Sequence, residues 1–457
     1  MLMDDEVRID PWGSSQSTDY SGIIEKFGLS SMEGVSLNSP SRLHRRGVVF
    51  AHRDLDMVLN AKKSGEPFGV LTGLMPSGRM HLGHSMVIDQ VNWFQQQGGD
   101  VTIAVADLES TATRGISLAE GKKIASEEYV SYYAALGLDP DKTTVYFQSE
   151  RNVVQKLGFQ LGKRTNLSEL EAIYGFDGST NLAHVQAPLV QAGDILHPQL
   201  NEYGGLRPIV VPVGIDQDPH LRLTRGLASK TNWFNVSDAK MGIQVGVSIQ
   251  EENSSIMGVE PSGRVNKERQ KEVFSKIVSA IQGLGYSDIM SNPKHGTVNI
   301  PSATSKDKGP IRMALLSLER SMGGMGLLAP SSTYHRFAVG MTGDKMSSSK
   351  PKTTLFLSDD IATAEKKIKK SFSGGQATIE EHRRLGGDPD KDVAYQYMMY
   401  FFEEDDKFLG EINQGYRAGK ILAGEMKQMC IERATDWLSN LAEKRDETAH
   451  LVDQFFE

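Results

Sequence analysis

The segment that follows residue 67 restricts the fold of this chain more than any other stretch. An apolar run at 68–72 leads into a glycine-bounded turn at 73–78, and a helical pattern follows until Gly98. Two further apolar runs, at 101–106 and 143–147, enclose a second helical pattern, which starts with the capping-box spacing of Ser117 and Glu120 and runs to about residue 136. Alternation of strand and helix is typical of a parallel sheet with crossover helices. The sequence therefore predicts an α/β fold with a doubly wound parallel sheet of the Rossmann type.

The rest of the sequence divides into regions of different character. Residues 1–66 form an appended N-terminal segment, and residues 67–231 hold the first part of the Rossmann-type domain. Residues 232–328 turn polar and rich in Gly and Ser, with helical patterns at about 267–283 and 311–320, which indicates an inserted element. Residues 329–365 return to the Rossmann-type domain, and residues 366–457 alternate charged and apolar residues at helical spacing. We expect an all-helical C-terminal domain there.

Cysteine content and charge restrict the cellular compartment and the binding partners that we expect for this chain. Cys430 is the single cysteine, which excludes an intrachain disulfide and a multi-cysteine zinc site. The apolar stretches stay well short of the ~18 residues of a membrane-spanning helix, and the acidic N-terminus differs from a signal peptide. The net charge is −8, so an RNA partner must meet a local basic patch. We expect a cytoplasmic protein without membrane attachment.

Two histidines, His81 and His84, stand where the glycine-bounded turn passes into the helix. Three residues apart on a first helical turn, they point the same way, and the free backbone N–H groups beside them form an anion site. Imidazoles at this place can donate hydrogen bonds to a phosphate whose charge grows in a transition state. The alternative is a pair of surface histidines at the start of a helix.

A loop of small residues at 343–350 carries the second motif, with Lys345 at its centre. Gly and Ser let the loop move and donate hydrogen bonds, while an ammonium on a flexible stem suits a departing pyrophosphate. Taken by itself the loop could equally be a solvated serine linker. Its occurrence after a histidine motif and a predicted sheet favours the phosphate interpretation.

Together the two motifs, HLGH at 81–84 and KMSSS at 345–349, resemble the HIGH and KMSKS signatures of class I aminoacyl-tRNA synthetases. The segment at 211–225, with its Asp-Gln pair, is similar to tryptophanyl-tRNA synthetases. Residues 9–12, 45–54 and 372–407 resemble the archaeal and eukaryotic branch of that family. The resemblance covers nearly the whole chain except about 232–328.

This resemblance implies a two-step reaction. Tryptophan attacks the α-phosphate of ATP to give tryptophanyl-adenylate and pyrophosphate, and the acyl group then passes to the terminal adenosine of tRNA(Trp). His81, His84 and Lys345 are implied to supply positioning and charge stabilisation, with Mg²⁺ brought by ATP and no metal held by protein ligands alone. A homodimer is expected from the family. The implied ATP contacts are Gly73, Ser77, Gly83, Met346, Ser347, Ser348 and Ser349.

For the amino-acid substrate, the resemblance places Glu109, Gln191 and Gln217 around the ammonium group, which a carboxylate and two amide oxygens suit. Each Gln has the alternative of a helix-surface amide. Asp194 lies three residues after Gln191, so one helical face presents both. It resembles the bacterial aspartate that accepts the indole N–H, although a capping or salt-bridged role is the alternative. Leu71 and Ala104 stand where the eukaryotic branch has polar readers of the substrate.

The C-terminal region resembles the anticodon-binding domain of the family, and the implied contacts are Phe372, Gln376 and Ala377. Gln376 and Ala377 replace an Arg-Asp pair of the eukaryotic branch. The acidic run at 403–406 is most simply a solvated face.

Two other functions compete with this interpretation. A tyrosyl-tRNA synthetase shares the fold and both motifs, but Leu71 lacks the hydroxyl that such enzymes place there. A catalytically silent RNA-binding paralogue would keep the fold and lose the phosphate chemistry, whereas His81, Gly83, His84 and Lys345 are all present.

Overall fold

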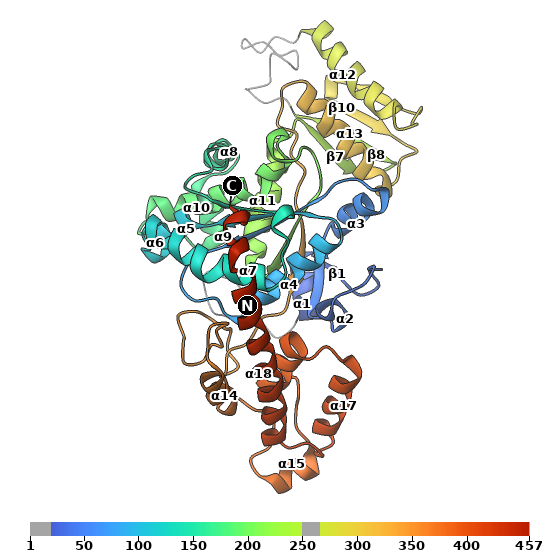
Figure 1. Cartoon of the computed structure of the whole chain (residues 1–457). Coiled ribbons are helices and arrows are strands. Elements are labelled where there is room, and N and C mark those ends of the chain that lie inside the picture. The colour runs from blue at the N-terminus through green and yellow to red at the C-terminus, as the bar shows by residue number, and fades with distance from the viewer. Residues whose placement is uncertain (1–19, 249–265, 457) are drawn as a thin grey trace.

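A computed structural model describes residues 20–248 and 266–456. Residues 9–12, which are part of the family resemblance, lie outside the described residues. A seven-stranded sheet forms the middle of an elongated molecule, with a smaller four-stranded sheet at one end and a helical region at the other (Figure 1). Within these described ranges, no helix is both long and apolar enough to cross a membrane.

The large sheet has the strand order β1-β2-β11-β6-β3-β4-β5. The five strands from β11 to β5 run parallel, which confirms the predicted doubly wound sheet. The N-terminal segment adds β1 and β2 to one edge as antiparallel strands. The strands are β1 (Ser30–Ser31), β2 (Val49–Arg53), β3 (Gly69–Leu74), β4 (Asp100–Val105), β5 (Thr143–Phe147), β6 (Ile209–Gly214) and β11 (Ser331–His335).

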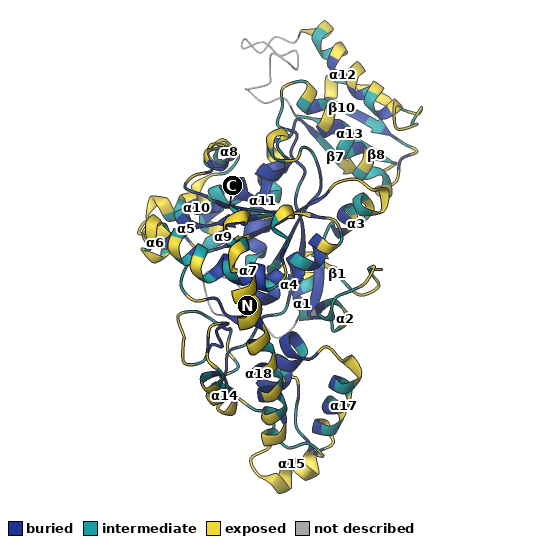
Figure 2. Ribbon diagram, viewed as in Figure 1, coloured by how far each residue is buried: buried dark blue, intermediate teal, exposed yellow. Residues whose placement is uncertain are grey.

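Strands β3, β4, β5 and β6 are largely apolar because helices cover both faces of the sheet. Strand β11 is equally buried although its residues are Ser, Ser, Thr, Tyr and His. Val70 belongs to the core on one face, with side chains of α4 (Leu82–Gln96). The next residue, Leu71, packs on the other face with Ile195 and Leu221. The strands of this sheet are accordingly buried, whereas α12 (Lys267–Gln282) and α15 (Ile379–Leu385) present many exposed residues (Figure 2).

The helix that the sequence predicts from Ser117 to about residue 136 is interrupted. It consists of α6 (Leu118–Ile124), the π-helical turn η1 (Ala125–Val130) and α7 (Ser131–Ala135). Ser117 caps its start as its spacing indicates, accepting a hydrogen bond from the Glu120 backbone N–H at 3.2 Å. A π-turn holds more residues than an α-turn and so changes where side chains point. Tyr129 in this turn reaches the cavity described below.

Residues 234–248 and 266–321 form a second α/β unit with a core of its own. Its antiparallel sheet has the order β7-β8-β10-β9 and was not predicted. The two helices expected at 267–283 and 311–320 are present as α12 and α13 (Lys308–Ser321), and Phe274, Ile277 and Leu315 belong to its core. The strands are β7 (Phe234–Asp238), β8 (Ile243–Val247), β9 (Met290–Asn292) and β10 (Thr297–Ile300).

The C-terminal region is helical, as predicted. One continuous hydrophobic cluster runs from Val70 in the sheet to Tyr397 and Leu438 in this region. Its helices, besides α15, are α14 (Ile361–Lys369), α16 (Val393–Tyr397), α17 (Asp406–Arg417) and α18 (Ala423–Thr448), with a π-turn η9 (Met398–Phe402).

The acidic run at 403–406 is not simply a solvated face, contrary to expectation. Glu403 is buried and pairs with Arg433 at 2.8 Å. Glu404 pairs with Arg42, and Asp406 pairs with two arginines of the N-terminal segment, Arg45 and Arg46, at 2.7 Å each. These ion pairs tie the helical region to the N-terminal segment.

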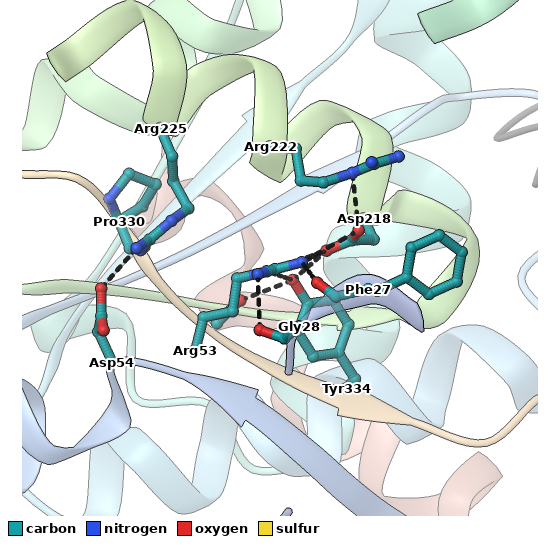
Figure 3. Close-up of polar contacts among 10 residues, drawn as sticks. Phe27, Gly28, Arg53, Asp54, Asp218, Arg222, Arg225, Pro330 and Tyr334 are labelled. Atoms are coloured by element: carbon teal, nitrogen blue, oxygen red, sulfur yellow. Dashed lines mark hydrogen bonds and ion pairs between the residues drawn. The ribbon is translucent and has the colours of Figure 1, made fainter. Parts of the chain in front are cut away.

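The fully buried carboxylate of Asp218 joins three distant segments (Figure 3). Asp218 starts α11 (Asp218–Thr231), and its Oδ1 lies 3.0 Å from Arg53 Nη2 of β2. The Tyr334 hydroxyl of β11 donates to the same oxygen at 2.6 Å, and Arg222 Nε lies 3.0 Å from Oδ2. Arg53 also donates to the backbone oxygens of Phe27 and Gly28. The network therefore fixes the start of α11 against the N-terminal segment and β11.

Asp218→Ala should lower the free energy of unfolding by about 3 to 5 kcal/mol, because it leaves the largely buried Arg53 without its counter-charge. Urea unfolding measures the loss. Asp390→Ala is the matched control: it breaks an exposed pair with Arg417, for which we expect less than about 1 kcal/mol. Equal losses in the two variants would contradict the importance of the Asp218 network.

Candidate active site

The site lies where the strand order of the large sheet reverses, between β3 and β6. Loops leaving the carboxyl ends of neighbouring parallel strands diverge at such a point and leave a crevice. Two adjoining hollows occupy it, and His84 and Gln217 line both. The outer hollow, of about 580 Å³, contains Ser77, His81, Gly83, His84, Lys345, Met346, Ser347, Ser348 and Ser349 in its wall. The inner cavity, of about 270 Å³, contains Gly73, Glu109, Gln191, Asp194 and Gln217.

The two histidines of the first motif stack at the start of α4, with ring centroids 3.7 Å apart. His84 Nδ1 accepts the backbone N–H of His81 at 3.1 Å. Burial lowers the pKa of His84 to about 4, so the ring is neutral at pH 7. A neutral imidazole that accepts at Nδ1 carries its proton on Nε2 and donates from there. A side chain at Gly83 would meet the His81 ring at 3.0 Å, so this position must stay small.

The second motif faces the histidines across the outer hollow. Lys345 Nζ lies 2.8 Å from Asp216 Oδ2 and 5.3 Å from the centre of the Phe337 ring. Asp216 lies in the turn η5 (Ile215–Gln217), just before α11. The serines that follow Lys345 shape the loop, since the hydroxyl oxygens of Ser347 and Ser349 lie within hydrogen-bond distance, 3.0 Å apart. The Asp216 carboxylate thus holds the Lys345 ammonium beside the hollow. A bound phosphate group can replace Asp216 as its ion-pair partner.

Helix α10 (Leu182–Leu196) presents Gln191 and Asp194 to the inner cavity, as their spacing predicts. Its position depends on a close approach to α8 (Asn152–Gly162). A Cβ at Gly193 would meet the Val154 backbone oxygen at 2.5 Å, and one at Gly158 would meet the Leu189 backbone oxygen at 2.8 Å. Glycines at these two positions let the helix backbones touch.

Apolar side chains make up much of the cavity wall, including Leu71, Ala104 and Val211. Glu109 reaches the cavity from the first turn of α5 (Asp107–Arg114), just after β4. Gln191 is partly exposed, and its Oε1 is buried without a hydrogen-bond partner among the described residues. An apolar wall with a few convergent polar groups is typical of a small-molecule site.

Asp194 is buried and already has hydrogen-bond donors. The Tyr146 hydroxyl donates to Oδ1 at 2.5 Å, and Gln148 Nε2 donates to Oδ2. Burial raises the pKa of Asp194 to about 7, although both hydrogen bonds oppose the rise. Burial also raises the pKa of Tyr146, which therefore keeps its proton and donates it. Tyr146 and Gln148 were missed in the sequence because a tyrosine and a glutamine around the end of a strand form no motif.

The structure brings the predicted catalytic, ATP and amino-acid residues into one crevice. His335, which the sequence analysis also missed, lines the outer hollow with a buried Nε2 that has no partner among the described residues. The three predicted anticodon residues lie apart from the crevice, before α15. Phe372 is 51% exposed, while Gln376 Nε2 donates to the Gly386 backbone oxygen at 3.0 Å.

The class of protein follows from this arrangement. A Rossmann-type sheet, a pair of histidines at a helix start and a lysine-bearing serine loop across one crevice are the features of a class I aminoacyl-tRNA synthetase. Among the described residues, no three His, Cys, Asp or Glu side chains lie close enough together to hold a metal ion.

Comparison with known proteins agrees with this class. The family of class I tRNA synthetases for W and Y matches residues 62–258 and 309–439. A tryptophan–tRNA ligase of Methanosarcina acetivorans is 38% identical over 457 residues, covering 98% of each chain. That of Thermoplasma acidophilum is 40% identical, covering 96% of this chain and 97% of the relative. The solved tryptophanyl-tRNA synthetase of Aeropyrum pernix is 34% identical with a TM-score of 0.71, covering 98% of this chain and 99% of that chain.

The chain belongs to the class I tRNA synthetase family for tryptophan and tyrosine, within its tryptophan–tRNA ligases. The family match omits residues 259–308. The alignment with the M. acetivorans relative covers 98% of both chains, so it must run through most of the region 232–328.

Asp194→Asn should stabilise the fold more at pH 8 than at pH 5. The folded-state pKa of about 7 exceeds the ordinary 3.8, so the folded chain keeps a proton that the unfolded chain releases between these values. Stability therefore falls as pH rises through this window, and the full cost persists above pH 7. Asparagine has no charge to bury, so its advantage over aspartate should grow by about 2 to 3 kcal/mol from pH 5 to pH 8.

Urea unfolding at the two pH values measures this advantage. Asp141→Asn, at an exposed position before β5, is the control for loss of a charge, and we expect a change within about 0.5 kcal/mol. An advantage of Asp194→Asn that is the same at both pH values would show that Asp194 is ionised in the fold throughout.

Proposed function

We propose that this chain activates L-tryptophan with ATP and transfers the tryptophanyl group to tRNA(Trp). The observation that carries the proposal is the crevice itself: one hollow holds the histidine pair and the lysine loop, and it opens into a cavity of about 270 Å³ with apolar walls. The tryptophan–tRNA ligases that match the full chain support it.

In the activation step, an oxygen of the tryptophan carboxylate bonds to the α-phosphorus of ATP while the bond to the bridging oxygen of pyrophosphate breaks. We infer that His84 donates from Nε2 to the phosphate and that Lys345 leaves Asp216 to neutralise the departing pyrophosphate. His81 holds the ring of His84 by stacking. Mg²⁺ arrives with ATP and adds charge neutralisation when bound.

The amino-acid substrate enters the inner cavity with its indole against the apolar wall. Glu109, Gln191 and Gln217 are the proposed partners of the ammonium group, and the buried, unpaired Oε1 of Gln191 supports this assignment. Asp194 belongs to the group of residues that reads the indole N–H. ATP contacts are assigned to Gly73, Ser77, Gly83 and the loop residues Met346, Ser347, Ser348 and Ser349.

We propose that tRNA meets the helical region around Phe372, Gln376 and Ala377. A large aromatic side chain that is 51% exposed, as Phe372 is, suits stacking on an unpaired base. We further propose a cytoplasmic homodimer. Phe159 of α8 and Leu182 of α10 are 84% and 80% exposed, and a second copy can cover these two apolar side chains.

Exchange of radioactive pyrophosphate into ATP, measured with each amino acid in turn, tests the proposed activity. Exchange that depends on tryptophan is expected. Exchange that depends on tyrosine would show a tyrosyl-tRNA synthetase instead. No exchange with any amino acid would indicate a catalytically silent paralogue.

Lys345→Ala should reduce adenylate formation by about 10²- to 10⁴-fold with tryptophan binding nearly unchanged, because its charge is needed where pyrophosphate develops. Single-turnover activation measures the rate. Lys352→Ala, an exposed lysine seven residues downstream of Lys345, is the control and should keep the parental rate. A Lys345→Ala rate equal to the parental one would remove Lys345 from the mechanism.

Phe372→Ala should raise the KM for tRNA(Trp) by about 5- to 100-fold, from the loss of one stacked base, while tryptophan-dependent exchange stays at the parental level. We choose a point substitution over truncation. A cut near residue 366 would remove α18 from α7 and expose the hydrophobic core that the two regions share. Met290→Ala, at a similarly exposed position of β9, is the control. Parental charging by Phe372→Ala would move the anticodon contact elsewhere.

A further inference from the structure

We propose that the side-chain oxygen of Gln148 accepts the indole N–H of tryptophan, and that Asp194 acts on the indole through Gln148 by fixing the direction of its amide. The inference rests on the proposed function and deepens it, because it assigns the residue that tells an indole from other bicyclic rings.

Gln148 has an acceptor to offer at the right place. It follows the end of β5, is 1% exposed and lines the inner cavity. Its Oε1 is buried and has no hydrogen-bond partner among residues 20–248 and 266–456. A buried acceptor without a partner is unfavourable. A ligand with an N–H group at this end of the cavity removes that cost.

The direction of the Gln148 amide is fixed by Asp194. Nε2 donates to Asp194 Oδ2. With the amide turned over, Oε1 would face an oxygen of the ionised Asp194 carboxylate, the form present above its pKa of about 7, and two acceptors repel. Oε1 is therefore directed away from Asp194. The other carboxylate oxygen, Oδ1, is engaged by the Tyr146 hydroxyl at 2.5 Å, so both oxygens of Asp194 already serve protein donors.

The backbone around Gln148 is held on both sides. Its N–H donates to the Val105 oxygen at 3.1 Å, and its carbonyl oxygen accepts from Gln155 Nε2 at 2.9 Å. The next backbone N–H, of Ser149, donates to Asp107 Oδ1 at 3.0 Å. An acceptor mounted in this way needs little rearrangement to bind its ligand, which favours selectivity.

Gln191 is the competing acceptor, since its Oε1 also lacks a partner. Gln191 is partly exposed, however, whereas Gln148 is almost fully buried. The charged ammonium of the substrate belongs at the wetter end of the cavity and the indole at the drier end. Burial therefore assigns Gln191 to the ammonium and Gln148 to the indole. Leu71 and Ala104, the other residues expected near the ring, have no acceptor in their side chains.

The test compares tryptophan with β-(1-benzothiophen-3-yl)alanine, in which sulfur replaces the N–H group. The readout is the ratio of the two KM values in ATP–pyrophosphate exchange. For the parental chain we expect the analogue to be about 10- to 100-fold weaker, because it leaves Oε1 unpaired. In Gln148→Met this ratio should fall to within about 3-fold of one.

Gln160→Met, at an exposed position of α8, controls for loss of a glutamine and should keep the parental ratio. Gln148→Leu replaces Gln148→Met if the latter does not fold, as judged by circular dichroism. A parental ratio retained in Gln148→Met or Gln148→Leu overturns the inference, as does a ratio near one in the parental chain. Absence of any tryptophan-dependent exchange in the parental chain would instead reject the proposed function.

Discussion

The geometry of the crevice depends on the contacts that the buried carboxylate of Asp218 makes with Arg53 and Tyr334. Asp216 and Gln217 directly precede Asp218, so anchoring Asp218 to Arg53 and Tyr334 also fixes one wall of the site. Tyr334 belongs to β11, whose chain continues into the loop of Lys345. A buried charge is tolerated when several partners satisfy it, and here these partners come from segments that must meet for the site to form.

The parallel core of the fold was predictable because its signal is local. Strands β3, β4, β5 and β6 are largely apolar, and the helices between them follow a helical period. The fifth parallel strand, β11, is buried but polar in sequence and gives no such signal. The pairing of β2 with β11 was not predictable, because it joins segments about 280 residues apart, such as His52 and Thr333. The four-stranded sheet was missed for another reason: its strands are only three to five residues long, and β9 is exposed throughout.

For the site, the residues that stand in a motif or match a family position were found, whereas Tyr146, Gln148 and His335, which do neither, were not. His81, His84 and Lys345 stand in short, characteristic strings. Gln148 becomes informative only when its amide is seen between Asp194 and the cavity. The acidic run at 403–406 was misjudged in the same way, since the arginines that pair with Glu404 and Asp406 lie some 360 residues earlier.

The strand that leads to Gln148 is also the edge of the large sheet, and an exposed edge is a liability that proteins cover. Here the C-terminal tail covers it: Phe456 pairs with Val145 in parallel, and its ring stacks on Phe147 at 5.5 Å. The tail follows α18. Arg445 of α18 donates to the Ser131 hydroxyl and to the Glu127 backbone oxygen, which holds α18 against η1 and α7. The helix that helps build the C-terminal region thus also protects the strand that ends beside the cavity.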